Sequence, residues 1–236
     1  MSTYKLVRHN RYNKDLPQEE ADAIERLRDG LKIRNWGPDI VIKAFRDLDT
    51  VFFRGRVVGN CLVRWRDTEG CISTHGDAHF YGSTAPLGPL ENRQTEITLH
   101  ANLMFLKCDD PYTEMWRTIL HEMVHAYSMI TSGWDEPDTT HDAMAGNQVG
   151  HGIHFGTCIL AVHKRAKKLF GLVAMDDPYN TPFRFDYIPK RKLQEFKEFI
   201  IERKHEEERQ KGWDMYYQGK WGPRDNPGHR GYRGRH

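Results

Sequence analysis

The sequence has 236 residues, with 35 basic and 33 acidic side chains, so its formal charge at pH 7 is only +2. This length suits one domain with its own core plus appended segments. The balanced charge means that the chain as a whole does not select a partner electrostatically. No stretch approaches the roughly 18 apolar residues that a membrane span requires, and the first residues lack the apolar region of a signal peptide. We therefore expect no membrane association.

The four cysteines, Cys61, Cys71, Cys108 and Cys158, are scattered and include no C-x-x-C pair. This spacing excludes a structural zinc site made only of cysteines, and it differs from the dense pattern of secreted disulfide proteins. We therefore expect a reducing, intracellular location and interpret these cysteines as small buried apolar residues.

The N-terminal half is predicted to pass from helices to strands. Residues 1–15 are polar and expected to be loose, and Pro17 begins a helix with acidic residues in its first turn. A second helix is expected after Pro38 and ends near Gly55. Residues 57–65, 71–73 and 78–81 are rich in strand-forming residues, 82–89 read as a Gly/Pro/Ser loop, and 96–101 alternate like a half-buried strand. Three or four strands should form a small, mostly antiparallel sheet.

Helical periodicity dominates the second half. Apolar residues recur at helical spacing over 112–130 and over 152–170, where Gly171 is the expected stop, and a late helix follows Pro189. The tail from residue 219 is rich in Gly, Pro and Arg and is expected to be disordered. We predict an α+β fold with helices packed on the sheet. Its parts are a flexible N-terminus (1–15), a catalytic-type domain (16–175), an extension with an amphipathic helix (176–213) and a disordered tail (214–236).

The main chemical signal is His121-Glu122-Met123-Val124-His125, inside the predicted helix 112–130. Residues four apart lie on one face of a helix, so both imidazoles can reach one metal ion. Glu122 is offset from that face, too far to be a ligand but near enough to act on a water molecule at the metal. Two histidine ligands and a neighbouring carboxylate are typical of hydrolytic zinc sites. The alternative is a solvated polar helix face.

A catalytic zinc ion needs a third protein ligand. Ser128 and Thr131 stand where a metzincin would have glycine and histidine, which excludes that class. The favoured candidate is His151, because the glycines on both sides leave its backbone unhindered. His154, at the start of the same predicted helix, and His141, in the preceding loop, remain alternatives.

These motifs resemble those of a known family. His121-Glu-Met-Val-His-Ala-Tyr127 together with Gly150-His-Gly-x-x-Phe155 is similar to the catalytic core of the SprT-like, or Spartan, metallopeptidases, and the similarity spans about 38–175. The resemblance implies a zincin-like core, Zn²⁺ held by His121, His125 and His151, and a catalytic Glu122. It also implies a nuclear, DNA-dependent protease that degrades proteins crosslinked to DNA.

Three features depart from that family's pattern. No cysteine follows Cys158, so the four-cysteine zinc ribbon common in the family is missing from this sequence. The segment 131–149 carries four acidic residues, which would repel a phosphate backbone. No adaptor motif for ubiquitin or for a replication clamp is evident. The basic tail, with Trp221 and Tyr232 among its arginines, could bind single-stranded nucleic acid, and the alternative is a solubilising disordered end.

The sequence therefore predicts a zinc-dependent endopeptidase in which Glu122 accepts a proton from the attacking water and returns it to the leaving amine. Its expected partners are protein substrates and single-stranded or damaged DNA. Two functions of other classes remain open. One is a nucleic-acid-binding module with a structural zinc site, and the other is a zinc hydrolase of a non-peptide substrate.

Overall fold

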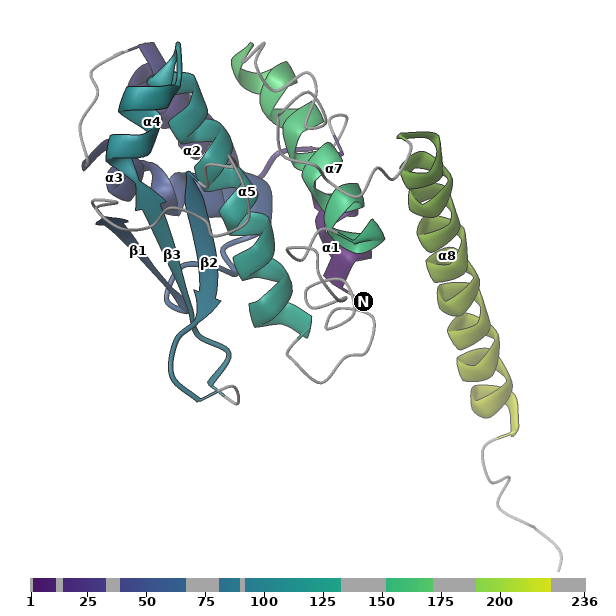
Figure 1. Ribbon diagram of the computed structural model, residues 1–236. Coiled ribbons are helices and arrows are strands. Elements are labelled where there is room, and N and C mark those ends of the chain that lie inside the picture. Colours follow the sequence, from purple (N-terminus) through teal and green to yellow (C-terminus); the bar gives the residue numbers. More distant parts are fainter. Residues whose placement is uncertain are drawn as a thin grey trace, which may run out of the picture. The chain divides into compact units, whose positions relative to one another are not determined.

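The computed structural model describes residues 2–11, 15–32, 39–66, 81–89, 92–132, 152–171 and 190–221. Within this part the chain forms seven α-helices, one short π-helix and a three-stranded sheet (Figure 1), as an α+β fold requires. The chain divides into two compact units, Met1–Lys197 and Glu198–His236. The expected strand at 71–73 and all but the last residue of the one expected at 78–81 lie outside the described residues.

The sheet has the order β1-β3-β2, with β1 at Cys61–Arg66, β2 at Gly82–Pro86 and β3 at Thr95–His100. β3 is the central strand, and its Ile97 and Leu99 are fully buried. It runs parallel to β1, with Cys61 opposite Thr95, and antiparallel to β2, with Thr84 opposite Ile97. The prediction of a mostly antiparallel sheet is therefore wrong, because the sheet is mixed. The chain reaches β2 before β3, and β3 then inserts between the two earlier strands.

Strand β2 corrects a second prediction, since its residues were expected to form a loop. Gly, Ser and Pro are poor strand formers, but β2 is an edge strand of the described sheet, and proline is tolerated at an edge. Pro86 closes the pairing opposite Thr95. A short edge strand can thus carry a composition that would not suit a central one.

Part of the N-terminal segment expected to be loose is helical. Ser2–His9 form helix α1, whose Leu6 and Val7 are buried although the segment is polar on average. Three apolar or aromatic residues at helical spacing are enough to give this short helix a buried face, which packs on α7 and α5. The Tyr127 hydroxyl of α5 donates a hydrogen bond to the Ser2 carbonyl.

The next helices follow the prediction. α2 spans Gln18–Lys32 and α3 spans Asp39–Leu48, and α3 continues as a π-helical turn, η1, at Asp49–Phe53. The chain leaves η1 through Arg54 and Gly55, both with positive φ. The buried Asp49 carboxylate accepts hydrogen bonds from the backbone N–H groups of Arg56, Val57 and Val58. These bonds join the end of the helix to the turn before β1.

Helix α5 (Pro111–Ser132) is the centre of the first unit. It packs on β2 and β3 on one side and on α7 (Ile153–Phe170) on another, so it lies between the sheet and the α1–α7 pair (Figure 1). The short α4 (Ala101–Lys107) connects β3 to it. Both long helices were predicted, and Gly171, with φ of 63°, ends α7 as expected. Cys158 of α7 is buried and forms no disulfide.

Helix α8 (Lys190–Trp221) confirms the late helix after Pro189 and runs from the first unit into the second. It continues through the first residues of the predicted disordered tail, and the remainder of the tail, 222–236, lies outside the described residues. Among the described helices, none combines the length and the apolar character that crossing a membrane requires.

Candidate metal and catalytic site

The first turn of α5 is fixed by a local cap. Asp110, directly before Pro111, accepts hydrogen bonds from the backbone N–H and the hydroxyl of Thr113, at 3.1 and 2.6 Å. A capping aspartate followed by proline at the first helical position is a strong helix start, because proline lacks the N–H that the helix could not satisfy there. The helix therefore begins at a defined residue, and its buried stripe, which includes Met115, Ile119 and Met123, fixes its rotation.

That rotation leaves His121 and His125 half-buried, on a face that the apolar stripe does not use. Their ring centroids are 5.1 Å apart. Two imidazoles one helical turn apart can direct ring nitrogens at one ion, and imidazole nitrogen is a preferred zinc ligand. The pair therefore fits two positions of a zinc coordination sphere.

Phe155, near the start of α7, packs on both histidines. Its ring centroid lies 4.2 Å from that of His125, in a stacked arrangement, and 4.9 Å from that of His121. This contact brings the beginning of α7 to the histidine pair. Gly152 is the N-cap of α7, and in the sequence it directly follows His151, the predicted third ligand.

Of the three candidates for that ligand, the structure describes His154 alone. His151 and His141 lie outside the described residues. His154 is described: its Nδ1 is 2.9 Å from the Thr3 hydroxyl of α1, and its ring is 4.9 Å from that of Phe196. It thus contacts different partners from Phe155. Within the described part of the chain, no three His, Cys, Asp or Glu side chains are gathered closely enough to hold a metal ion.

Glu122 is buried against the sheet, with only 6% of its surface exposed. The Thr84 hydroxyl of β2 lies 2.7 Å from Glu122 Oε2 and 3.0 Å from the Glu122 carbonyl oxygen. A hydroxyl has one hydrogen to donate, so the shorter contact, to the carboxylate, is the stronger one. Burial raises the pKa of Glu122 to about 7, and the hydrogen bond from Thr84 opposes this rise. A carboxyl group with such a pKa can both accept and release a proton near neutral pH.

Gly82 makes the close approach of β2 to α5 possible. A Cβ at this position would lie 2.6 Å from Thr118 Cγ2, 3.0 Å from Glu122 Cγ and 3.2 Å from Glu122 Oε1. The first distance is shorter than any ordinary carbon–carbon contact. A side chain here would therefore push the strand off the helix and displace Thr84 from the carboxylate.

Sequence reasoning missed Thr84 and Gly82, although it identified Glu122. Both lie in the segment interpreted as a loop, and neither residue type is chemically distinctive. No local pattern pairs residue 84 with residue 122, because the contact depends on the mixed sheet. Other predicted features also lie outside the described residues: the acidic segment after Ser132 and the basic end of the tail.

The described geometry combines three elements. Two half-buried imidazoles offer nitrogen ligands on one face of α5, a buried carboxyl group on the same turn has a pKa of about 7, and the adjacent edge strand supplies a hydroxyl that orients it. Such a set suits proton transfer beside a bound cation.

Comparison with known proteins gives one match. A model of the family described as SprT-like matches residues 41–170. This range extends from α3 to the last residue of α7 and includes the histidine pair, Glu122 and β2. Searches among curated proteins and among solved structures found no match.

Proposed function

The chain belongs to the SprT-like family, and from this premise we propose that it is a zinc-dependent endopeptidase acting on protein substrates. The observation that carries the proposal is the environment of Glu122. It is buried beside the histidine pair without a described cation partner, and its pKa is about 7. Strongly perturbed carboxyl groups of this kind cluster at catalytic sites.

His121, His125 and His151 are the proposed zinc ligands. The shared face of the first two and the packing of Phe155 on both support this set, since His151 precedes Phe155 by only four residues. The contacts of His154 with Thr3 and Phe196 favour His151 over His154 as the third ligand. A bound zinc ion would supply a Lewis acid that polarises the peptide carbonyl and makes a water molecule more acidic.

Glu122 is the proposed general base and then general acid. Thr84 holds Oε2, so the other carboxylate oxygen is the one available to accept a proton. The same group can then give that proton to the leaving amine, because a pKa near 7 makes both transfers accessible at neutral pH. Thr84 is the proposed positioning residue, since its hydroxyl contacts the base.

We further propose that the substrates are DNA-associated proteins, including DNA–protein crosslinks, and that the protein acts in the nucleus. This part rests on the resemblance to Spartan-type enzymes. The two other functions predict different results. A structural zinc site would not require Glu122, and a hydrolase of non-peptide bonds would not cleave proteins.

The test measures zinc content and casein cleavage, with and without single-stranded DNA, for the wild type and the variants Glu122→Gln, His151→Ala and His154→Ala. We expect about one zinc per chain in all but His151→Ala, and cleavage lost in Glu122→Gln and His151→Ala. Glu114→Gln is the matched control, because Glu114 lies two turns earlier on α5 and its pKa is also raised by burial.

Each assignment has its own contradicting outcome. Zinc retained in His151→Ala and lost in His154→Ala would mean that His154, and not His151, is the third ligand. Undiminished cleavage in Glu122→Gln would refute its role as the base. Zinc binding without cleavage of any protein would favour one of the other two functions, and stimulation by DNA would support the Spartan-type role.

A further inference from the structure

Helix α1 contacts the ends of both helices that form the proposed metal site, although it lies outside the range of the family match. That match begins at residue 41, whereas α1 spans Ser2–His9. In the first turn of α1, the Ser2 hydroxyl lies within hydrogen-bond distance of the hydroxyl of Ser132, the last residue of α5. The next residue, Thr3, has its hydroxyl 2.9 Å from His154 Nδ1 at the start of α7. α1 therefore joins the end of the helix that carries the histidine pair to the beginning of α7.

Thr3 is a polar residue on the buried face of α1. Only 5% of its surface is exposed, and the other buried residues of this helix are Tyr4, Leu6 and Val7. A buried hydroxyl without a hydrogen-bond partner costs free energy, and valine would fill the same space without that cost. The contact with His154 therefore explains the hydroxyl at this position better than packing does.

The first turn of α7 is held on two sides. Phe155 packs on the histidine pair of α5, and one residue earlier His154 contacts Thr3 of α1. Successive residues of a helix point about 100° apart, so the two contacts together restrain both the position and the rotation of this turn. His151, the proposed third ligand, is joined to the turn through the N-cap residue Gly152.

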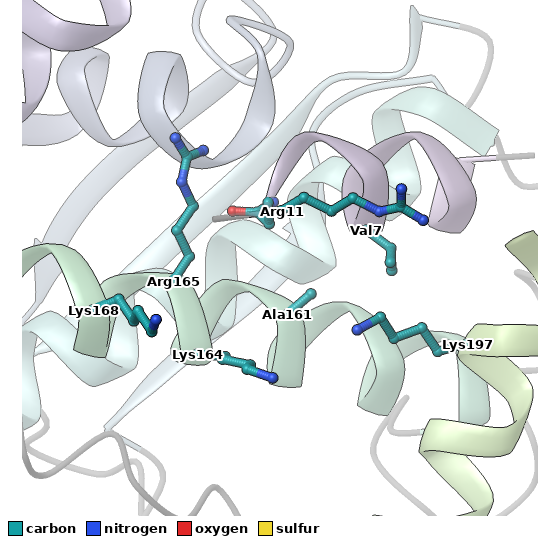
Figure 2. Close-up of a pocket in the computed structure, with 8 residues that line it drawn as sticks. Val7, Arg11, Ala161, Lys164, Arg165, Lys168 and Lys197 are labelled. Atoms are coloured by element: carbon teal, nitrogen blue, oxygen red, sulfur yellow. The ribbon is translucent and has the colours of Figure 1, made fainter. Parts of the chain in front are cut away.

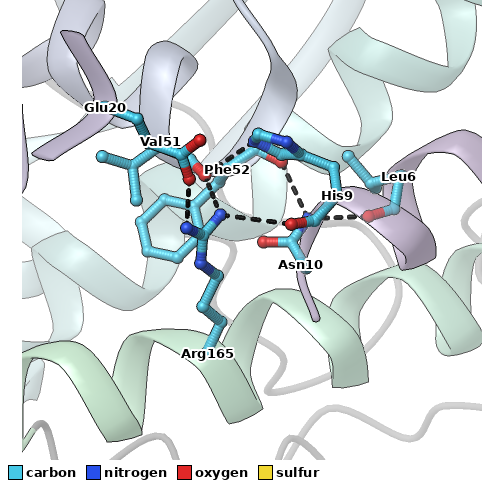
Figure 3. Close-up of polar contacts among 7 residues, drawn as sticks. All are labelled: Leu6, His9, Asn10, Glu20, Val51, Phe52 and Arg165. Atoms are coloured by element: carbon cyan, nitrogen blue, oxygen red, sulfur yellow. Dashed lines mark hydrogen bonds and ion pairs between the residues drawn. The ribbon is translucent and has the colours of Figure 1, made fainter. Parts of the chain in front are cut away.

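Apolar packing alone does not fix α1 against α7. A hollow of about 460 Å³ lies beside the end of α1 and the C-terminal half of α7, and Val7 is part of its lining (Figure 2). Surfaces that border a hollow lack contacts there, so directional contacts at the ends of α1 matter more for its placement. Just beyond the end of α1, Asn10 Nδ2 donates to the Phe52 carbonyl of η1 at 2.8 Å (Figure 3). At the other end, Thr3 and His154 make the corresponding contact.

We propose that Thr3 is a second positioning residue of the zinc site, acting through His154 and the first turn of α7 on the third ligand, His151. This inference rests on the proposed function, because it takes His151 as that ligand. Without the Thr3 contact, the first turn of α7 has one restraint fewer, so His151 is presented to the metal over a wider range of positions and the ion is held less tightly. Partners that bond directly to a metal ligand change metal affinity by roughly 10- to 100-fold. An indirect partner should have a smaller effect.

The test measures the zinc affinity of the full chain by competition with a chromophoric chelator, for the wild type and three variants. Thr3→Val removes the hydroxyl but keeps the shape and a similar helix propensity, and Thr3→Ser keeps the hydroxyl. Asn10→Ala is the control, because it removes two hydrogen bonds at the other end of α1. We expect the affinity to be about fivefold lower in Thr3→Val, mostly restored in Thr3→Ser and unchanged in Asn10→Ala.

A double variant separates this role from a general loss of stability. His154→Ala alone should lower the zinc affinity by about the same factor of five while still binding one zinc per chain at saturation. If Thr3 acts through His154, adding Thr3→Val to His154→Ala should lower the affinity no further, because the two residues share one interaction. The absorption spectrum of the Co²⁺-substituted protein reports geometry at the metal, so it should change in Thr3→Val and not in Asn10→Ala.

Three results would overturn the role of Thr3 alone: a zinc affinity of Thr3→Val equal to that of the wild type, equal losses in Thr3→Val and Asn10→Ala, or additive losses in the double variant. The second result would mean that α1 only contributes stability. Failure of the proposed function has a different signature. A wild type that binds no zinc, or zinc lost outright in His154→Ala, would contradict the proposed ligand set and, with it, this inference.

Discussion

Two buried glutamates of this protein have opposite surroundings. Glu20 of α2 is 4% exposed and faces the Arg165 guanidinium, which two backbone carbonyls also hold in place (Figure 3). Glu122 of α5 is 6% exposed and has the Thr84 hydroxyl as its described partner. The Glu20 carboxylate is neutralised by Arg165, whereas the Glu122 carboxylate has no cation beside it among the described residues.

This difference separates a structural role from a chemical one. A buried ion pair with its hydrogen bonds satisfied fixes neighbouring elements, here α2, α7 and η1, in one arrangement. A buried carboxyl group without a cation resists ionisation, so it keeps a proton to a higher pH and exchanges it there. The same type of side chain therefore holds helices together at Glu20 and can transfer a proton at Glu122.

The largest effect should follow from Glu20→Gln, which leaves the Arg165 charge buried without its counter-ion. Breaking one half of a buried pair costs about 3–5 kcal/mol of unfolding free energy. Urea denaturation measures this loss of unfolding free energy. Glu25→Gln is the matched control on α2, because Glu25 is exposed and forms an ion pair with the exposed Arg28, so the loss of unfolding free energy should be far smaller. Equal losses in the two variants would mean that the Glu20–Arg165 pair does not tie the elements together.

The same substitution at Glu122 should act in the opposite direction. Its pKa is raised from 4.5 to about 7 in the folded state, so the folded protein holds this proton more tightly than the unfolded chain. The associated stability is complete below pH 4.5 and is lost as the pH rises through 7. In zinc-free protein, the unfolding free energy of Glu122→Gln should therefore rise relative to that of the wild type by up to about 3 kcal/mol between pH 4.5 and pH 8. A stability difference that is constant over this range would contradict the raised pKa.

His163 of α7 extends the comparison to a base. It is 4% exposed, neither ring nitrogen has a hydrogen-bond partner among the described residues, and burial lowers its pKa from 6.5 to about 3. The unfolded chain binds this proton more tightly, so stability falls as the pH drops below 6.5. Between pH 7 and pH 5 the loss from this group is about 2 kcal/mol. His163→Leu should remove that part of the acid sensitivity in urea denaturation at the two pH values, and an unchanged pH dependence would exclude His163 as its source.

The smallest effect concerns Thr84. Thr84→Val keeps the shape but removes the hydrogen bond to Glu122, and Thr84→Ser keeps the hydroxyl. Loss of this one hydrogen bond to the base should lower kcat about tenfold, which corresponds to about 1.4 kcal/mol, with KM little changed. Serine should restore most of the rate. A serine variant as slow as the valine variant would assign Thr84 a packing role only.

The sequence predicted the helices well because each carries a strong local pattern. The apolar stripe of α5 and the stop at Gly171 are both short-range signals, and each appears in the structure where it was expected. The histidine pair follows from the same reasoning, since a spacing of four residues on a helix is itself a local geometric statement.

The features that escaped prediction depend on contacts between distant segments. α1 forms because α5 and α7 offer an apolar surface, and β2 forms because β3 and α5 flank it. The partner of Glu20 is separated from it by 145 residues, and the partner of Glu122 by 38. Residue type alone indicates neither pairing, because threonine and arginine are common at surfaces and acquire these roles only through the fold.

The position of α1 has a consequence for the order of events during biosynthesis. α1 leaves the ribosome before α7, which supplies Arg165 and contacts Thr3 through His154 and is made about 150 residues later. At typical elongation rates the interval is on the order of ten seconds. Throughout it the apolar face around Leu6 and Val7 and the Glu20 carboxylate lack their final partners. The nascent chain thus exposes the amphipathic α1 segment throughout this interval, and chaperone binding to α1 is the step to look for in vivo.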